Sequence, residues 1–300
     1  MNADHETFIP TETVDDGGYR RWVLPNGDLH RLDGPAVISP TGMQSWWQYG
    51  QLHREDGPAS TNVGGVEEWQ RHGQRHRDHD LPAVTSKDGT QEWWVNGQRH
   101  RAGDQPAVIR ADGTKEWWRY GVRHREGAPA ITGPDGREEW FWLGTRHRNV
   151  GPALVSGDGR EEWWVNGRKH RDGGPAVIGG HVTEAWYYFG QLHREGGPAL
   201  THRNGTQEWY AHGWRHRDGG GPAVVRPWGE REWWENGMRH RDGAPAVEHD
   251  TGYEAWYFLD RLHRAGAPAV THADGTHEWW ENGERRTPTP TVRPPTGPPK

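Results

Sequence analysis

Aromatic, glycine and proline residues recur along the chain with a period of 23 or 24 residues. The block at residues 162–176, EWWVNGRKHRDGGPA, is repeated in recognisable form eleven times. Each copy contains one His-Arg pair, and these pairs begin at His30, His53, His76, His100, His124, His147, His170, His193, His216, His240 and His263. A twelfth, degenerate copy has Arg285-Arg286 where Arg-His is expected. Self-similarity at this period indicates an array of one supersecondary unit.

Two spans within the repeat have a constant length. In all copies but the first, seven residues separate the first Trp from the His, as from Trp93 to His100. Eleven residues separate the Pro from the next Trp, as from Pro129 to Trp140, whereas the distance from His to Pro is five or six residues. The constant spans predict paired strands, because a one-residue slip would turn every side chain to the other face. We expect two strands per repeat, one through R-H-R and P-A-V and one through E-W-W, with a surface loop in the variable span.

Turn signals separate these predicted strands. Asp-Gly pairs such as Asp88-Gly89 precede the E-W-W segment, and Asn-Gly pairs such as Asn96-Gly97 follow it. Both dipeptides accept the positive φ angles of tight hairpin turns. The predicted fold is therefore all-β: an elongated, twisted, single-layer antiparallel meander of about eleven β-hairpin repeats. The alternative is a β-solenoid, which would stack each Arg on the next at about 4.8 Å.

The repeats also define the predicted domain organisation. Residues 1–19 form an N-terminal lead-in or cap, residues 20–286 form the array, and residues 287–300 form a Pro/Thr-rich tail. The tail composition favours an extended segment that serves as a spacer or as a docking peptide. Leu259-Asp260, in place of the usual x-Gly, and Arg286 indicate that the array is being terminated there.

Composition narrows the class of protein. Only 31% of the residues are hydrophobic, but 21 are Trp, which fits a thin sheet whose apolar mass is aromatic. The formal charge of −6, with both signs in nearly every repeat, argues against a nucleic-acid partner. There is no Cys, so disulfides and thiolate metal sites are excluded. Without a signal-like N-terminus or an apolar stretch of membrane length, we expect a soluble protein, cytoplasmic or virion-associated, with no membrane span.

The aromatic pair, the following Asn-Gly and the later Gly resemble the MORN repeat, in particular a bacterial variant of antitoxin-like proteins. The sequence motif H-R-x-D-G-P-A-V is similar to that of a subtype associated with large DNA viruses and bacteriophages. The resemblance covers the array from Trp22 to Arg286. It implies a single-layer sheet of hairpins and a scaffold or assembly role, with no catalytic residues. The H-R and G-P-A blocks depart from the familiar pattern, and lipid binding is therefore not carried over.

The Trp pairs place an aromatic column on each face of the predicted sheet, because neighbouring strand residues face opposite sides. We expect the first column to pack against Pro and Ala as core. The second column either lies open for binding or is covered by Arg through cation–π contacts. The His-Arg pairs form a second ladder, and two further Trp residues break the pattern and mark a possible local hot spot. The candidate binding residues are Trp94, Trp118, Trp164, Trp234, Trp280, His100, Arg101, His124, Arg125, His170, Arg171, His240, Arg241, Trp214 and Trp228.

The regularly spaced His residues do not predict a metal site. Zinc needs ligands within about 2 Å of one ion, whereas meander repeats step by roughly 9.6 Å. We instead expect His and Arg to bond loop carbonyls or the Glu residues of the adjacent strand. Eleven His residues in near-identical surroundings are predicted to titrate together near the ordinary pKa of about 6.5, which would change the formal charge from −6 to −6 + 11 = +5.

The sequence favours a non-enzymatic protein without cofactors, because a catalytic site needs a unique constellation and every polar residue type here is repeated. The first hypothesis is a scaffold for protein–protein interaction, self-association or structural assembly, including a component of a phage or viral particle. The second is a module that binds a glycan or another extended polymer. The third is an antitoxin-like neutralising partner. Unpaired sheet edges would favour self-association.

Overall fold

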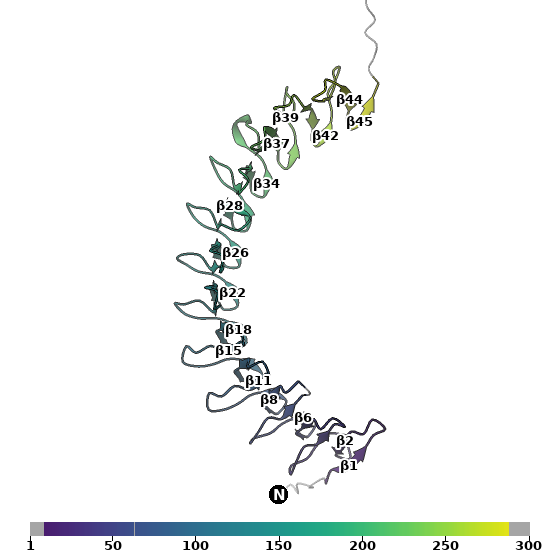
Figure 1. Cartoon of the computed structure of the whole chain (residues 1–300), viewed down its shortest axis with the longest axis vertical. Coiled ribbons are helices and arrows are strands. Elements are labelled where there is room, and N and C mark those ends of the chain that lie inside the picture. Colours follow the sequence, from purple (N-terminus) through teal and green to yellow (C-terminus); the bar gives the residue numbers. More distant parts are fainter. Residues whose placement is uncertain (1–8, 63, 288–300) are drawn as a thin grey trace, which may run out of the picture. The chain divides into compact units, whose positions relative to one another are not determined.

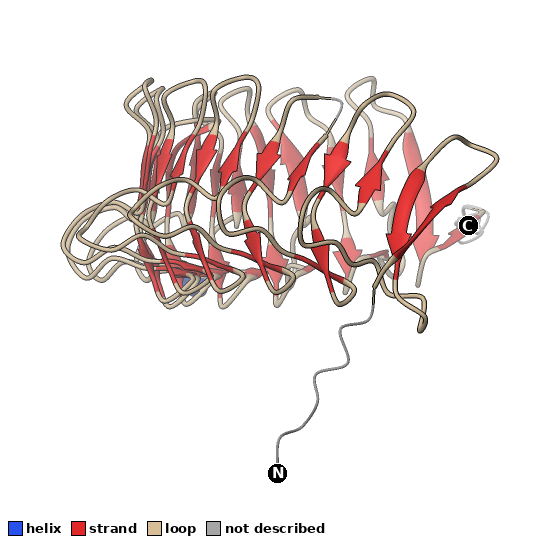
Figure 2. Cartoon of the chain, turned by 90° about the horizontal axis from the view of Figure 1, so that it is seen from below, coloured by secondary structure: helices blue, strands red, loops and turns tan. Residues whose placement is uncertain are grey.

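The computed structural model describes residues 9–62 and 64–287. The remainder of the predicted lead-in (residues 1–8) and nearly all of the predicted tail (residues 288–300) lie outside the described residues. The chain divides into two compact units, Met1–Asp158 (unit 1) and Gly159–Lys300 (unit 2). Both units consist of short strands joined by turns and loops, and η1 (Asp218–Gly220) is a single 3-10 turn (Figure 2).

In each unit, consecutive strands pair antiparallel into one sheet, which we call the repeat sheet. In unit 1 its strands follow in the order β1 (Thr11–Val14), β2 (Arg20–Val23), β3 (Val37–Ile38), β4 (Gln44–Ser45), β7 (Ser60–Thr61), β8 (Glu67–Glu68), β11 (Val84–Thr85), β12 (Gln91–Glu92), β15 (Val108–Ile109), β16 (Lys115–Glu116), β19 (Ile131–Thr132), β20 (Glu138–Glu139) and β23 (Leu154–Val155). In unit 2 they follow in the order β24 (Glu161–Glu162), β27 (Val177–Ile178), β28 (Val182–Ala185), β31 (Leu200–His202), β32 (Gln207–Glu208), β35 (Val224–Val225), β36 (Glu230–Glu232), β39 (Val247–His249), β40 (Glu254–Ala255), β43 (Val270–Thr271) and β44 (His277–Glu281).

From the second repeat on, each repeat also contains a two-stranded ladder, which we call the turn hairpin. In unit 1 these are β5/β6 (Trp47–Gln48, Gln51–Leu52), β9/β10 (Gln70–Arg71, Gln74–Arg75), β13/β14 (Trp94–Val95, Gln98–Arg99), β17/β18 (Trp118–Arg119, Val122–Arg123) and β21/β22 (Phe141–Trp142, Thr145–Arg146). In unit 2 they are β25/β26 (Trp164–Val165, Arg168–Lys169), β29/β30 (Tyr187–Tyr188, Gln191–Leu192), β33/β34 (Tyr210–Ala211, Trp214–Arg215), β37/β38 (Trp234–Glu235, Met238–Arg239), β41/β42 (Tyr257–Phe258, Arg261–Leu262) and β44 with β45 (Glu284–Arg286).

The predicted all-β antiparallel meander of repeated hairpins is confirmed, and the antiparallel pairing excludes the solenoid alternative. Within unit 1, strands that are neighbours in the sheet are also close in sequence, as the purple-to-teal colours show (Figure 1). The expectation of two strands per repeat is wrong in detail, because the chain leaves the repeat sheet at the first Trp. The Trp93 N–H donates to the Ala107 carbonyl at 2.8 Å, and its own carbonyl accepts the His100 N–H at 3.1 Å. R-H-R and P-A-V therefore lie in different ladders, separated by the variable loop.

The core of each repeat is centred on the Ala of the P-A-V block. This Ala is fully buried in all eleven copies, from Ala36 to Ala269. Its N–H and its carbonyl both bond E-W segments, as when Ala107 donates to Glu116 at 2.8 Å. The two turn predictions hold as well. Gly89 has a φ of 91°, and Asn96 and Gly97 have φ values of 46° and 75°, as a type I′ hairpin turn requires.

Candidate binding surface

The tips of most turn hairpins are attached to the preceding repeat through a His side chain, although the Nδ1 atoms of His100 and His240 have no hydrogen-bond partner among the described residues. The residue before the turn Gly has a positive φ, as in Leu143 at 45°, and its backbone N–H donates to the His124 Nδ1 at 3.2 Å. The same contact joins Tyr49 to His30 and Asn282 to His263, both at 3.1 Å. In these copies the ladder His accepts through Nδ1 and positions the hairpin of the next repeat rather than facing a ligand.

The turn hairpins carry most of the exposed large apolar side chains. In each unit, we call the exposed apolar side chains of the turn hairpins the hairpin-tip surface. In unit 1 this surface consists of Tyr49, Tyr120, Val122, Trp142 and Leu143. In unit 2 it consists of Tyr188, Phe189, Trp214, Met238, Phe258 and Leu259. Several of these rings contact a ladder His of the preceding repeat, such as Tyr120 on His100 at 4.2 Å and Phe189 on His170 at 4.0 Å between ring centroids. The predicted candidates included only Trp214 from this surface.

The residue after the turn Gly packs over the turn Gly of the next repeat. An added Cβ at Gly144 would lie 3.4 Å from Val122, and one at Gly237 would lie 2.5 Å from Trp214. The turn Gly also donates its N–H to the preceding hairpin, as from Gly144 to the Arg123 carbonyl at 2.9 Å. Neighbouring tips within a unit are thereby held at a fixed spacing.

The Arg of the His-Arg pair covers the first Trp column. The guanidinium carbon of Arg125 lies 3.8 Å from the Trp117 ring centroid, and that of Arg101 lies 3.8 Å from Trp93. Arg171 on Trp163 and Arg241 on Trp233 repeat this contact at 3.8 and 3.7 Å. These arginines also donate to the carbonyl of the Pro in their own loop, as from Arg101 to Pro106 at 3.3 Å. The predicted bonds to loop carbonyls are thus confirmed for Arg, and these four candidates are occupied within the fold.

The second Trp column is half-buried and interleaved with the basic residue that precedes the His. Arg99 lies 4.8 Å from the Trp94 ring and 5.1 Å from the Trp118 ring. The indole Nε1 of Trp118 donates to the Glu116 carboxylate at 3.0 Å. The same indole bond is made by Trp94, Trp164, Trp234 and Trp280, at 2.7 to 2.9 Å. Of the two expectations for this column, the structure favours the one with cationic groups over the rings.

Glu116 and Glu208, beneath this column, are buried, and the pKa of each carboxyl is lowered. Burial opposes ionisation of Glu116 most strongly, but Arg110 and Arg123 outweigh it and lower the pKa of the carboxyl. Burial and a hydrogen bond to Glu208 raise the pKa of Tyr210 to about 12. The expectation that the His-Arg pair bonds this Glu is wrong for Glu116, because the partner is the Arg before the His, Arg123, at 3.2 Å.

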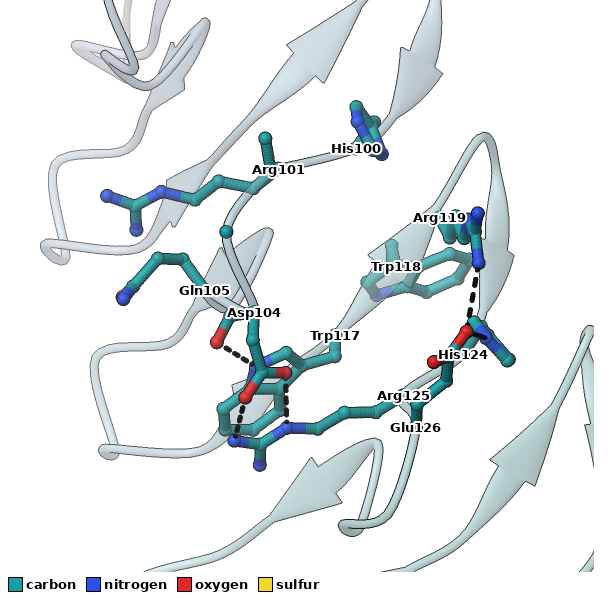
Figure 3. A pocket seen from close by; sticks show the side chains of 12 residues that line it. His100, Arg101, Asp104, Gln105, Trp117, Trp118, Arg119, His124, Arg125 and Glu126 are labelled. Carbon is teal, nitrogen blue, oxygen red and sulfur yellow. Dashed lines mark hydrogen bonds and ion pairs between the residues drawn. The ribbon is translucent and has the colours of Figure 1, made fainter.

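A hollow of about 360 Å³ lies between two consecutive loops of unit 1 and brings together five predicted residues. They are His100, Arg101, Trp118, His124 and Arg125. Figure 3 shows the Asp104 carboxylate facing Arg125, with two oxygen–nitrogen distances of 2.8 and 2.9 Å, and Arg119 facing Glu126 at 3.3 Å. Unit 2 has an equivalent hollow of about 380 Å³ lined by Trp234, His240 and Arg241. The charges that line the first hollow are thus largely paired within the protein.

Loop length has a specific effect that the sequence analysis missed. In the loops with the extra residue, a loop carbonyl accepts the indole N–H of the next first-column Trp, as from Trp93 to Asp80 and from Trp117 to Asp104, both at 3.0 Å. After five-residue loops, the buried Nε1 atoms of Trp140, Trp186 and Trp256 have no hydrogen-bond partner among the described residues. The sequence did contain a signal for this difference, namely which His-to-Pro spacings are six residues instead of five.

Trp214 and Trp228 do not share an element. Trp214 lies in the hairpin β33/β34 and is 63% exposed. Trp228 lies in the turn between β35 and β36 and is 52% exposed. The two residues provide exposed indoles inside and outside the hairpin-tip surface.

The predicted uniform titration of the ladder His residues near 6.5 is wrong for two of them. Burial is the main cause that lowers the pKa of His53, with a further contribution from His72. Burial and Arg119 lower the pKa of His100. Repeats of similar sequence therefore differ in electrostatic surroundings.

Among the described residues, no group of three or more His, Cys, Asp or Glu could hold a metal ion, and no helix is long and apolar enough to cross a membrane.

The chain was also compared with known proteins. No protein-family model matches it, and no curated protein matches it.

Proposed function

We propose that the protein is a non-enzymatic repeat scaffold that binds a protein partner through the hairpin-tip surface. The observation that carries this proposal is the row of exposed apolar side chains at regularly spaced hairpins. Trp142 and Leu143 are 50% and 59% exposed, and Trp214 is 63% exposed. Contiguous exposed apolar residues on a soluble domain mark interaction sites, and Trp and Tyr are the residues most enriched among binding hot spots.

The rigidity of the tips supports the same proposal. Most tips are fixed by a His from the preceding repeat and by the turn Gly bond, as at Leu143 and Gly144, so little side-chain or loop entropy is lost when a partner binds. The resemblance to MORN repeats is consistent with a scaffold role, including assembly into a larger particle. The glycan hypothesis has less support from the geometry. The indole rings of the second column are flanked by Arg side chains, whereas sugar stacking needs an open ring face.

The test uses a matched pair of variants, Trp214→Ser in the hairpin-tip surface and Trp228→Ser outside it. The full chain is used as bait, and each captured protein is identified and its affinity is measured with both variants. Loss of a hot-spot Trp should weaken binding by at least about 2 kcal/mol, or about 30-fold. We expect this loss for Trp214→Ser and unchanged binding for Trp228→Ser. Equal effects of both substitutions, or Trp fluorescence quenching by oligosaccharides with no effect of Trp214→Ser on protein capture, would overturn the proposal.

A further inference from the structure

The last strand of the repeat sheet in unit 2 is unpaired on one side at His277 and Glu278. β44 pairs at His277 and Glu278 with β43 on one side, whereas the equivalent strand β40 has β39 on one side and β43 on the other. The reason is visible in the sequence, because no P-A-V block follows Arg286. At His277 and Glu278 the second side of β44 therefore has no strand partner among the described residues, whereas Trp279–Glu281 pair with β45.

The first strand of unit 1 is unpaired on one side as well. β1 pairs with β2 and with no other strand of residues 9–62 and 64–287. All four of its residues are exposed, and Val14 is 65% exposed. An exposed and unpaired edge strand is a template for another chain.

The register shows that β1 occupies the position of a P-A-V strand. In β11, Val84 lies opposite Glu92, and Thr85 lies opposite Gln91, one and two residues before Trp93. In β1, Thr13 and Val14 lie opposite the residues one and two before Trp22. Thr13 and Val14 thus correspond to Val84 and Thr85, and Glu12 corresponds to Ala83. The array begins with a P-A-V-type strand and ends with an E-W-W strand.

Each of these two edges lacks the neighbour that the other edge provides. An interior strand such as β11 pairs with the E-W strand on both sides, since Val84 lies opposite Glu92 and also opposite Glu68. We propose that β44 of one copy pairs antiparallel with β1 of a second copy. In this contact Glu278 lies opposite Thr13, and His277 lies opposite Val14. His277 and Val14 then take the places of Glu67 and Thr85, which are paired between β8 and β11.

This contact continues the antiparallel pairing from one copy into the next and does not depend on the hairpin-tip surface. The directly opposed pairs, Glu278 with Thr13 and His277 with Val14, contain no like charges, which would destabilise a cross-strand pair. Addition of a strand to a sheet edge gains main-chain hydrogen bonds. The two edges differ, so the contact is heterologous, and copies add in series until a ring closes or a filament forms.

The absence of Cys from the chain allows a direct test by disulfide cross-linking. Two full-length single variants, Val14→Cys and His277→Cys, are mixed under mild oxidation, so that only a contact between copies can join them. Both positions are exposed and lie outside the buried core. The matched control replaces Val14→Cys with Thr13→Cys, because a shift of one residue points the side chain to the opposite face. We expect a cross-linked species of twice the 34.2 kDa chain mass, at least about tenfold more abundant with the matched pair than with the shifted pair.

Light scattering on the unmodified chain completes the test. We expect a mass above 34.2 kDa that rises with protein concentration up to about 100 µM, a range that detects weak contacts. A constant monomer mass with no cross-link would overturn the proposal, as would equal cross-linking of the matched and shifted pairs. Association that disappears when the chain is shortened to end at Thr287 would assign the contact to residues 288–300 and would also overturn it. Trp214→Ser should leave the association unchanged, which separates this result from the test of the proposed function.

Discussion

The contact between His124 and Leu143 is the most direct place to test how one repeat positions the next. The Leu143 N–H lies 3.2 Å from the His124 Nδ1, and the His124 side chain is 4% exposed. Its ring also contacts Trp142 at 4.7 Å in an edge-on arrangement. The substitution His124→Phe keeps a planar ring beside Trp142 but removes the acceptor. The change therefore isolates the hydrogen bond from most of the packing.

The magnitude follows from the lost hydrogen bond. A donor left without its partner in a buried position costs about 1–3 kcal/mol. Leu143 also has a positive φ of 45°, which costs roughly 1–2 kcal/mol with or without the bond and therefore does not add to the change. We expect the free energy of opening this hairpin to fall by about 1–3 kcal/mol, or by about 5–150-fold in the opening equilibrium.

Amide hydrogen exchange is the appropriate assay, because repeat arrays open locally and the exchange of one amide reports the opening of one hairpin. The exchange rate of the Leu143 amide is compared in the unsubstituted chain, in His124→Phe and in the control His181→Phe. His181 is exposed in a turn, so its substitution should change stability by less than about 0.5 kcal/mol. Unchanged protection of the Leu143 amide in His124→Phe would refute the assignment of the ladder His as the anchor of the next hairpin.

Three further outcomes follow from the same contacts. Leu143→Asn should stabilise the hairpin by about 1 kcal/mol in denaturant unfolding, because Asn tolerates a positive φ at lower cost; equal or lower stability would contradict the strain argument. Ala107→Val should destabilise unit 1 by about 1–3 kcal/mol, because Ala107 is fully buried, whereas Ala102→Val in the exposed loop should have little effect; equal effects in thermal unfolding would contradict the packing of the core. Burial and Arg119 lower the pKa of His100 in the folded chain below its ordinary value of 6.5. The unfolded chain therefore binds more protons at this residue than the folded chain does. The contribution of His100 to stability is present in full above pH 6.5 and is lost as the pH falls. His100→Gln should therefore reduce the loss of stability between about pH 7 and about pH 5, and an unchanged pH dependence would show that His100 does not contribute.

The sequence alone was sufficient for the fold because strand register and turn chemistry are local properties. The constant spacing from Pro129 to Trp140 reports a ladder, and Asn96-Gly97 reports a type I′ turn, and the structure contains both. The corner at Trp93 was not predictable in the same way. It depends on hydrogen bonds to Ala107 and His100, which lie 14 and 7 residues further along the chain.

The candidate site was less predictable because the same residue pair serves two different partners. His124 and Arg125 are adjacent in sequence, yet the His contacts the next turn hairpin and the Arg stacks on Trp117 within its own repeat. Periodicity identified both as important but could not separate structural contacts from exposed ones. Nor could it identify Tyr120 or Leu143, which replace the usual Asn of the turn and are exposed. The available sequence signal was that Tyr120 and Leu143 each occupy a turn position that favours Asn.

The contacts of the ladder His have a consequence for changes in chain length. From His30 to His263, the described hydrogen bonds of this type join residues 19 or 20 positions apart, and thus one repeat to its immediate successor. Removal or duplication of one whole period inside a unit therefore recreates each bond with the new neighbour. A deletion of any other length leaves a ladder His without the turn N–H that donates to it, and leaves that N–H without its acceptor. Recombination can consequently add or remove whole repeats, whereas the spacing of residues within each repeat is constrained.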